Sequence, residues 1–206
     1  MKIKNFGIVA ILFLASGCND VAVKPYEMVL NKTPSQVDMA GYTMVDQDGK
    51  ATDKPVKAKD RFSQYLYAPS DYVGKALKEE KDADLVIFNT LDGKIAYSIV
   101  NVSVDKMKTV QDVLKSKYGP ALATRAGVRD KAAFESSPGF CKAYNPEAGL
   151  EQNHCPMDYY EIYGTVDEAY VLVKAKSIYA NGPEKLLVAG ITRDAKNYLD
   201  SIKQSP

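Results

Sequence analysis

Several residue types are scarce in this 206-residue chain, which contains no tryptophan, one histidine and three cysteines. So few histidines and cysteines leave little material for a histidine-based metal site or a catalytic triad. Net charge is also small, because 27 basic side chains are balanced by 26 acidic ones to leave a formal charge of +1. This balance argues against the global basic field by which proteins attract nucleic acid, so we expect no nucleic-acid partner.

Sequence motifs that carry known chemistry are missing as well. The chain contains no GxGxxG or P-loop motif for holding phosphates, and no GxSxG motif of serine hydrolases. Two acidic pairs, Glu79-Glu80 and Asp167-Glu168, could be carboxylates for acid–base work, but such neighbours near turns are usually solvated charges. We therefore expect no catalytic residue, no metal site and no cofactor, and we expect that the protein is not an enzyme.

The first 18 residues hold the clearest functional signal. Lys2 and Lys4 precede a run of ten apolar or glycine residues from Phe6 to Ala15. An ordinary transmembrane helix needs about 20 apolar residues, so this run is too short to be one. A positive start followed by a short apolar run is typical of a secretory signal peptide. Small residues then lead directly into Cys18.

The segment Leu14-Ala15-Ser16-Gly17-Cys18 resembles the lipobox of bacterial lipoproteins. The resemblance covers about 18 residues and implies that residues 1–17 are a signal peptide, removed in the mature protein. It also implies that the Cys18 thiol receives a diacylglyceryl group, that the new amino group is acylated, for example with palmitate, and that these chains hold the protein on a membrane. Asn19, where aspartate would favour the inner membrane, implies the outer membrane facing the periplasm. An ordinary secretory signal, with Cys18 uninvolved, is the alternative.

The two remaining cysteines, Cys141 and Cys155, form an even pair in a chain that we expect to be exported, which favours a disulfide bond. Turn-forming residues lie between them, and closing a loop of about 15 residues is worth roughly 3 kcal/mol. The alternative is a reactive thiol at Cys155 activated by His154. Adjacent residues of an extended chain point to opposite faces, however, which argues against contact between them.

The rest of the chain predicts a single α+β domain, residues 37–206, preceded by a lipidated tether, residues 18–36, whose later part docks on the domain. Apolar and β-branched runs predict strands at 42–45, 62–67, 83–90, 94–104, 157–166, 169–179 and 185–191. Helices are expected from Ser70, from Thr109 to Gly119 and from Thr192 or Asp194. We expect a mainly antiparallel sheet with two or three helices packed on one face.

The strand at 94–104 is expected to lie centrally in the sheet, because both of its faces carry bulky side chains. Strict alternation places Ala96 with Val100 on one face and Ile95 with Ile99 on the other. Residues 46–60 are interpreted as turn and loop, and residues 123–140 as irregular or weakly helical. Tyrosines in the expected strands are interpreted as packing residues.

The hypothesis about function rests on two features of the sequence: a strong signal for a membrane anchor, and no recognisable set of catalytic residues. The leading hypothesis is an envelope lipoprotein that acts as a noncatalytic binding or assembly module, with the membrane and an envelope protein as its partners. One alternative is an envelope hydrolase whose site a single sequence cannot reveal. Another is an inhibitor or immunity lipoprotein that presents the loop between Cys141 and Cys155 to a target.

Overall fold

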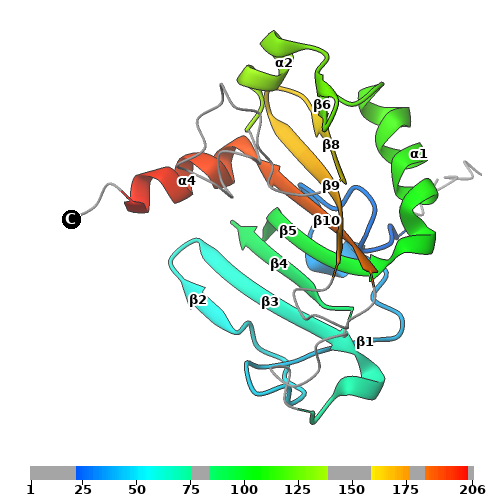
Figure 1. Ribbon diagram of the computed structural model, residues 1–206. Coiled ribbons are helices and arrows are strands. Elements are labelled where there is room, and N and C mark those ends of the chain that lie inside the picture. Colours follow the sequence, from blue (N-terminus) through cyan, green and yellow to red (C-terminus); the bar gives the residue numbers. More distant parts are fainter. Residues whose placement is uncertain (1–21, 76–83, 139–158, 177–183, 204–206) are drawn as a thin grey trace, which may run out of the picture.

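The computed structural model describes residues 22–75, 84–138, 159–176 and 184–203 (Figure 1). Ten strands in these residues form one antiparallel sheet: β1 (Tyr42–Met44), β2 (Lys57–Lys59), β3 (Phe62–Pro69), β4 (Val86–Leu91), β5 (Lys94–Ser103), β6 (Ala123–Thr124), β7 (Gly127–Val128), β8 (Tyr159–Gly164), β9 (Glu168–Lys176) and β10 (Glu184–Thr192). The helices are α1 (Met107–Tyr118), α2 (Lys131–Ser136) and α4 (Arg193–Lys203), with 3-10 turns η1 (Pro34–Gln36), η2 (Ser70–Tyr72) and η3 (Val104–Lys106). The predicted α+β class is confirmed.

Strand β5 lies in the middle of the sheet, as predicted. The strand order is β1-β3-β4-β5-β10-β9-β8-β6-β7, and β2 pairs with β3 outside this path. The turn between β4 and β5 uses Asp92 and Gly93, both with positive φ, of 52° and 77°. Two consecutive residues with positive φ match the twist of the strands they join, which is why an Asp-Gly pair predicts a tight hairpin.

A β-bulge corrects the predicted faces of β5. Asn89 lies opposite Tyr97 and Thr90 lies opposite Ile95, so Ala96 is an extra residue with no partner in β4. An extra residue shifts the alternation of side chains, and those before the bulge change face. Ile95 therefore belongs to the same core cluster as Val100, whereas Ala96 packs in the opposite cluster.

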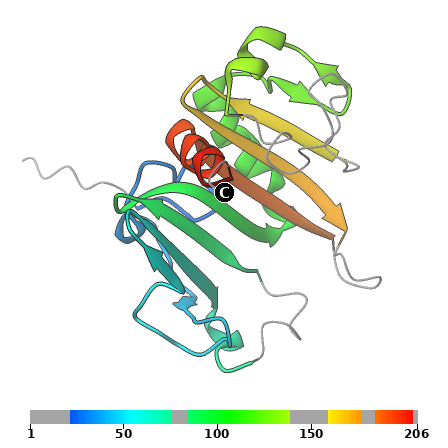
Figure 2. The ribbon, with the colours of Figure 1, turned by 90° about the vertical axis from the view of Figure 1, so that its left-hand side faces the viewer.

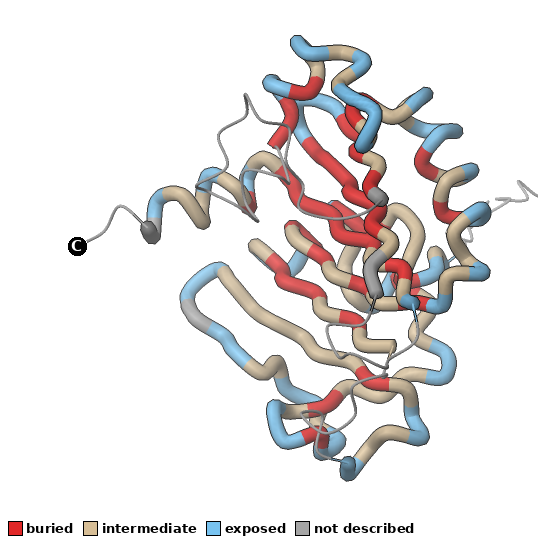
Figure 3. The backbone as a smooth tube through the Cα atoms, viewed as in Figure 1, coloured by how far each residue is buried: buried red, intermediate tan, exposed pale blue. Residues whose placement is uncertain are grey.

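Each face of the sheet has its own hydrophobic core, and the helices divide between the two faces. Val110 and Leu114 of α1 pack in one core, whereas Phe134 of α2 and Ala195 of α4 pack in the other. In Figure 1 α4 and α1 lie on opposite sides of the sheet, and in Figure 2, viewed from the side of α4, helix α1 in green lies behind α4. The expectation that all helices share one face was therefore wrong. Because both faces are covered, buried residues concentrate in the central strands (Figure 3).

Helix boundaries were predicted best where the signals are local. Helix α1 ends at Gly119, whose φ is 73° and whose N–H donates to the Lys115 carbonyl at 2.9 Å. Helix α4 begins after Thr192, whose Oγ1 accepts from the Ala195 N–H at 3.2 Å, as an N-cap does. Thr109 is not an N-cap, since α1 already begins at Met107 after η3. At Ser70 the described chain forms only the three-residue turn η2.

Short strands were missed in the regions interpreted as loop or as irregular or weakly helical. Strand β2 lies within residues 46–60, and strands β6 and β7 lie within residues 123–140. These strands are two or three residues long, so their sequences contain too few positions to show a period. Helix α2 in the second region has a local signal, because Asp130 accepts from the Ala133 N–H at 3.0 Å as its N-cap.

Candidate functional site

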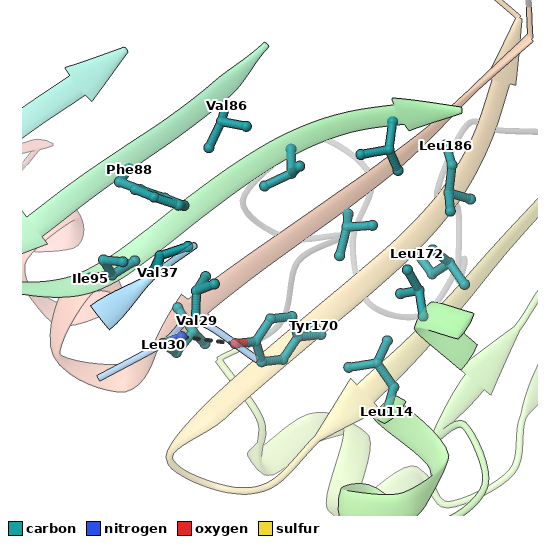
Figure 4. Close-up of a cluster of buried hydrophobic side chains, with 14 of the residues drawn as sticks. Val29, Leu30, Val37, Val86, Phe88, Ile95, Leu114, Tyr170, Leu172 and Leu186 are labelled. Carbon is teal, nitrogen blue, oxygen red and sulfur yellow. Dashed lines mark hydrogen bonds between the residues drawn. The ribbon is translucent and has the colours of Figure 1, made fainter. Parts of the chain in front are cut away.

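An irregular N-terminal segment, Val23–Val37, lies across one face of the sheet, and we call it the strap. Its residues Val29, Leu30 and Val37 are buried in the core that α1 also covers (Figure 4). Val23 forms an isolated parallel bridge with Val37, and its carbonyl accepts from the Asp38 N–H at 2.8 Å. The later part of the expected tether therefore does dock, and its packing begins as early as Val23.

Backbone hydrogen bonds join the strap to β5 at the bulge. The Asn31 N–H donates to the Ile95 carbonyl at 2.9 Å, and the Ile95 N–H donates to the Lys32 carbonyl at 2.7 Å. The pairing of β5 with β10 ends at Tyr97 and Ile191, so the backbone N–H and carbonyl of Ile95 can bond to a segment other than β10. The strap takes this place. The strap satisfies only some of its backbone groups internally, for example through the Lys32 N–H that donates to the Val29 carbonyl, and a buried unpaired group would be costly.

Tyr170 of β9 holds the middle of the strap. Its hydroxyl accepts from the Leu30 N–H at 3.0 Å, shown by the dashed line in Figure 4. The ring lies over Gly190, where a Cβ would come within 2.8 Å of Tyr170 Cε1 and 3.0 Å of Ser98 Oγ. Glycine is therefore needed at this position to make room for the ring. Burial raises the pKa of Tyr170, so this hydroxyl stays protonated at physiological pH.

Glu168, at the start of β9, joins the strap to α1. Its Oε1 accepts from Lys117 Nζ and from the Tyr118 hydroxyl, the latter at 2.8 Å, and its Oε2 accepts from Asn31 Nδ2 at 3.4 Å. The Glu168 side chain is only 11% exposed, whereas that of Lys117 is 42% exposed. The interpretation of Glu168 as a solvated charge was wrong, although its neighbour Asp167 is exposed. Burying a carboxylate is favourable only when donors of this kind surround it.

The chemistry available at this cluster is that of binding and positioning. Burial, followed by the hydrogen bond to Glu168, raises the pKa of Tyr118, which disfavours a tyrosinate nucleophile. Both oxygens of Glu168 already accept hydrogen bonds from protein donors. A general base needs an oxygen within reach of the proton that it removes. The cluster instead ties three elements together: the strap, the end of α1 and the start of β9.

The residues predicted to carry modifications all lie outside the described residues: Cys18, Cys141 and Cys155. Among the residues described, no helix is long and apolar enough to cross a membrane. The same residues bring together no group of three or more His, Cys, Asp or Glu side chains that could hold a metal ion. The polar cluster that joins the strap to α1 and β9, which we call the strap cluster, consists of Asn31, Lys117, Tyr118 and Glu168. It was missed from sequence, where the apolar group Met28-Val29-Leu30 indicated only that this part of the tether docks.

Comparison with known proteins gives no relative. No protein-family model, no curated protein and no solved structure matches the chain.

Proposed function

We propose that this protein is a bacterial envelope lipoprotein, anchored by acyl chains on Cys18, whose domain is a noncatalytic binding or assembly module. The observation that carries the proposal is the order of features in residues 1–18: lysines, a ten-residue apolar run, small residues and a cysteine. Two or more acyl chains give stable membrane attachment where one does not. The outer membrane, with the domain facing the periplasm, is the location that Asn19 favours.

The strap supports a positioning role for the domain. Its packing begins five residues after Cys18, and its buried part is bonded to β5 and β9. A membrane anchor joined to a fixed segment transmits its position to the whole sheet. The buried carboxylate in the same region serves this attachment, because its oxygens bond to Asn31, Lys117 and Tyr118. This arrangement fits a module that holds a partner near a membrane.

Replacing the modified cysteine tests the anchor. Cys18→Ser removes the thiol that forms the thioether, so we expect no incorporation of radioactive palmitate and release of the protein from membranes. Cys141→Ser is the matched control and should keep both the label and the membrane association. Palmitate labelling that persists in Cys18→Ser would contradict the anchor.

Crosslinking in the native envelope, followed by mass spectrometry, tests the module. A binding or assembly role predicts one envelope protein recovered in stoichiometric amount with the wild-type chain. The Cys18→Ser variant, once released from the membrane, should lose most of this crosslink. Turnover of an envelope substrate by the purified protein, without a stable neighbour, would contradict the noncatalytic assignment.

The proposed disulfide between Cys141 and Cys155 has its own test. Peptide mapping of exported protein without reduction should show the two cysteines linked. Two free thiols in normally exported protein would refute the bridge.

A further inference from the structure

The chain between the proposed anchor and the fixed domain is short. Cys18 and Val23 are five residues apart, so the chain between them spans at most about 17 Å. From Val23 onward the backbone is held by Val37 and Asp38, and the Lys24 ammonium pairs with the Asp38 carboxylate. The whole of residues 18–36, had it been free, would have reached about 60 Å. Docking of the strap removes most of that reach.

We call the chain between Cys18 and Val23 the leash, and the domain is wider than the leash is long. A compact domain of about 180 residues has a radius of gyration near 16 Å, and its opposite surfaces lie roughly 40 Å apart. The strap and α1 pack on one face of the sheet, and α4 packs on the other. In Figure 1 the strap, in blue, lies on the side of the sheet away from α4. A leash fixed on the strap side is too short to let the α4 side reach the membrane.

We propose, on the basis of the lipid anchor above, that the short leash holds the strap and α1 side of the domain against the lipid headgroups. The α4 side then faces away from that membrane and is the surface left open to a protein partner.

The charge on the outer side of α1 is compatible with this contact. Lys108 and Lys115 are exposed there, with Asp112 as the exposed acid of the same helix. Lysines next to a membrane are attracted by anionic headgroups, and the attraction falls off within a Debye length. Lys108 also pairs with Asp112, and Lys117 with Glu168, so this attraction adds to the leash and does not replace it.

Photo-crosslinking to lipid in the native membrane tests the orientation. A benzoylphenylalanine replaces one exposed residue at a time in the full chain: Ala40, two residues from Asp38, Ser116 on α1, or Asn197 on α4. Mass spectrometry then measures the fraction of each labelled peptide that carries a phospholipid. We expect several-fold more lipid adduct at Ala40 and Ser116 than at Asn197.

A longer leash is the matched control. Inserting about 20 Gly/Ser residues between Asp20 and Val21 adds a coil with an r.m.s. length of about 25 Å, and it should bring the three positions toward equal adduct levels. Equal adducts at all three positions with the natural leash would overturn the inference, as would a bias that the insertion leaves unchanged.

The mass of the Cys18 peptide is measured in the same samples. If this peptide is acylated but the positions label equally, the orientation fails while the anchor stands. If it carries no acyl chain, the anchor itself fails.

Discussion

The two faces of the sheet are built from different side chains. Both cores contain large aromatic residues, but the described core beneath the strap and α1 contains no fully buried alanine and is filled by large side chains such as Phe88, Tyr163 and Tyr170. The core beneath α2 and α4 contains five buried alanines: Ala96, Ala123, Ala169, Ala189 and Ala195. Small residues suit a face on which a regular helix lies close to the strands. The face without buried alanines instead carries an irregular segment, the strap, in addition to a helix.

The difference shows what an irregular segment needs that a helix does not. A helix satisfies most of its own backbone groups, whereas the buried strap must find donors and acceptors in the sheet. It finds them at the Ile95 backbone and at the Tyr170 hydroxyl. The strap face is therefore held by specific polar contacts as well as by burial, and four changes test this contrast.

The largest effect is expected from truncating a buried leucine, and it is tested by comparing helix α1 with helix α4. Leu114→Ala on α1 removes a side chain that is 1% exposed, and we expect a loss of about 3 kcal/mol in the free energy of unfolding. Leu199→Ala on α4 removes a half-buried side chain and should cost about 1 kcal/mol, because less area leaves the core. Urea unfolding of both variants measures the difference. Equal losses would mean that α4 is packed as tightly as α1.

The next effect concerns the space beneath Tyr170. Gly190→Ala places a Cβ within 2.8 Å of the ring, and such overpacking should cost about 2 kcal/mol of stability. Combining it with Tyr170→Leu, which removes the ring, should give a double variant more stable than the sum of the two single losses predicts. Strict additivity in urea unfolding would show that Gly190 is not needed for Tyr170.

A smaller effect comes from one hydroxyl. Tyr170→Phe leaves the Leu30 N–H buried without its acceptor, and we expect a loss of about 1 kcal/mol. Hydrogen exchange at the Leu30 amide should become faster at the same time. Tyr163→Phe is the matched control, since the Tyr163 hydroxyl donates to Glu161. If the Leu30 amide exchanges at the wild-type rate in Tyr170→Phe, this hydrogen bond does not hold the strap.

The smallest expected effect is a loss of stability at alkaline pH that is absent at neutral pH. Burial raises the pKa of both Tyr118 and Tyr170 above the ordinary value of 10.0. Above pH 10 the unfolded chain releases these phenolic protons while the folded chain keeps them, so stability falls as the pH rises. Below pH 10 both states keep the protons and the effect vanishes.

Urea unfolding between pH 8 and pH 11 measures this dependence, with Tyr118→Phe as the comparison. This variant lacks one of the phenols whose pKa is raised by burial, so its stability should fall less steeply above pH 10 than that of the wild type. Equal slopes for the two proteins would contradict the burial of Tyr118 as the cause.

The sequence predicted what depends on neighbouring residues and missed what depends on distant ones. The turn at Asp92-Gly93, the end of α1 at Gly119 and the start of α4 at Thr192 were correct, because each is decided within a few residues. The faces of Ile95 and Ala96 were exchanged, since alternation alone does not reveal an unpaired residue in a strand.

The strap cluster could not be predicted for the same reason. Glu168 is buried because Asn31 and Lys117 surround it, and these residues are 137 and 51 positions away in the chain. No spacing rule connects them. The segment that resembles a lipobox, by contrast, consists of a few consecutive residues, so the sequence alone predicts Cys18 as the anchor although the described residues begin only at Ala22.

Mass spectrometry of the N-terminal peptide from protein extracted out of membranes is the most direct test of the lipid anchor. A peptide that begins at Cys18 and carries acyl chains is the result expected. A peptide that begins at Met1, or one that contains Cys18 with a free thiol, would contradict the anchor and remove the basis for the membrane-facing strap.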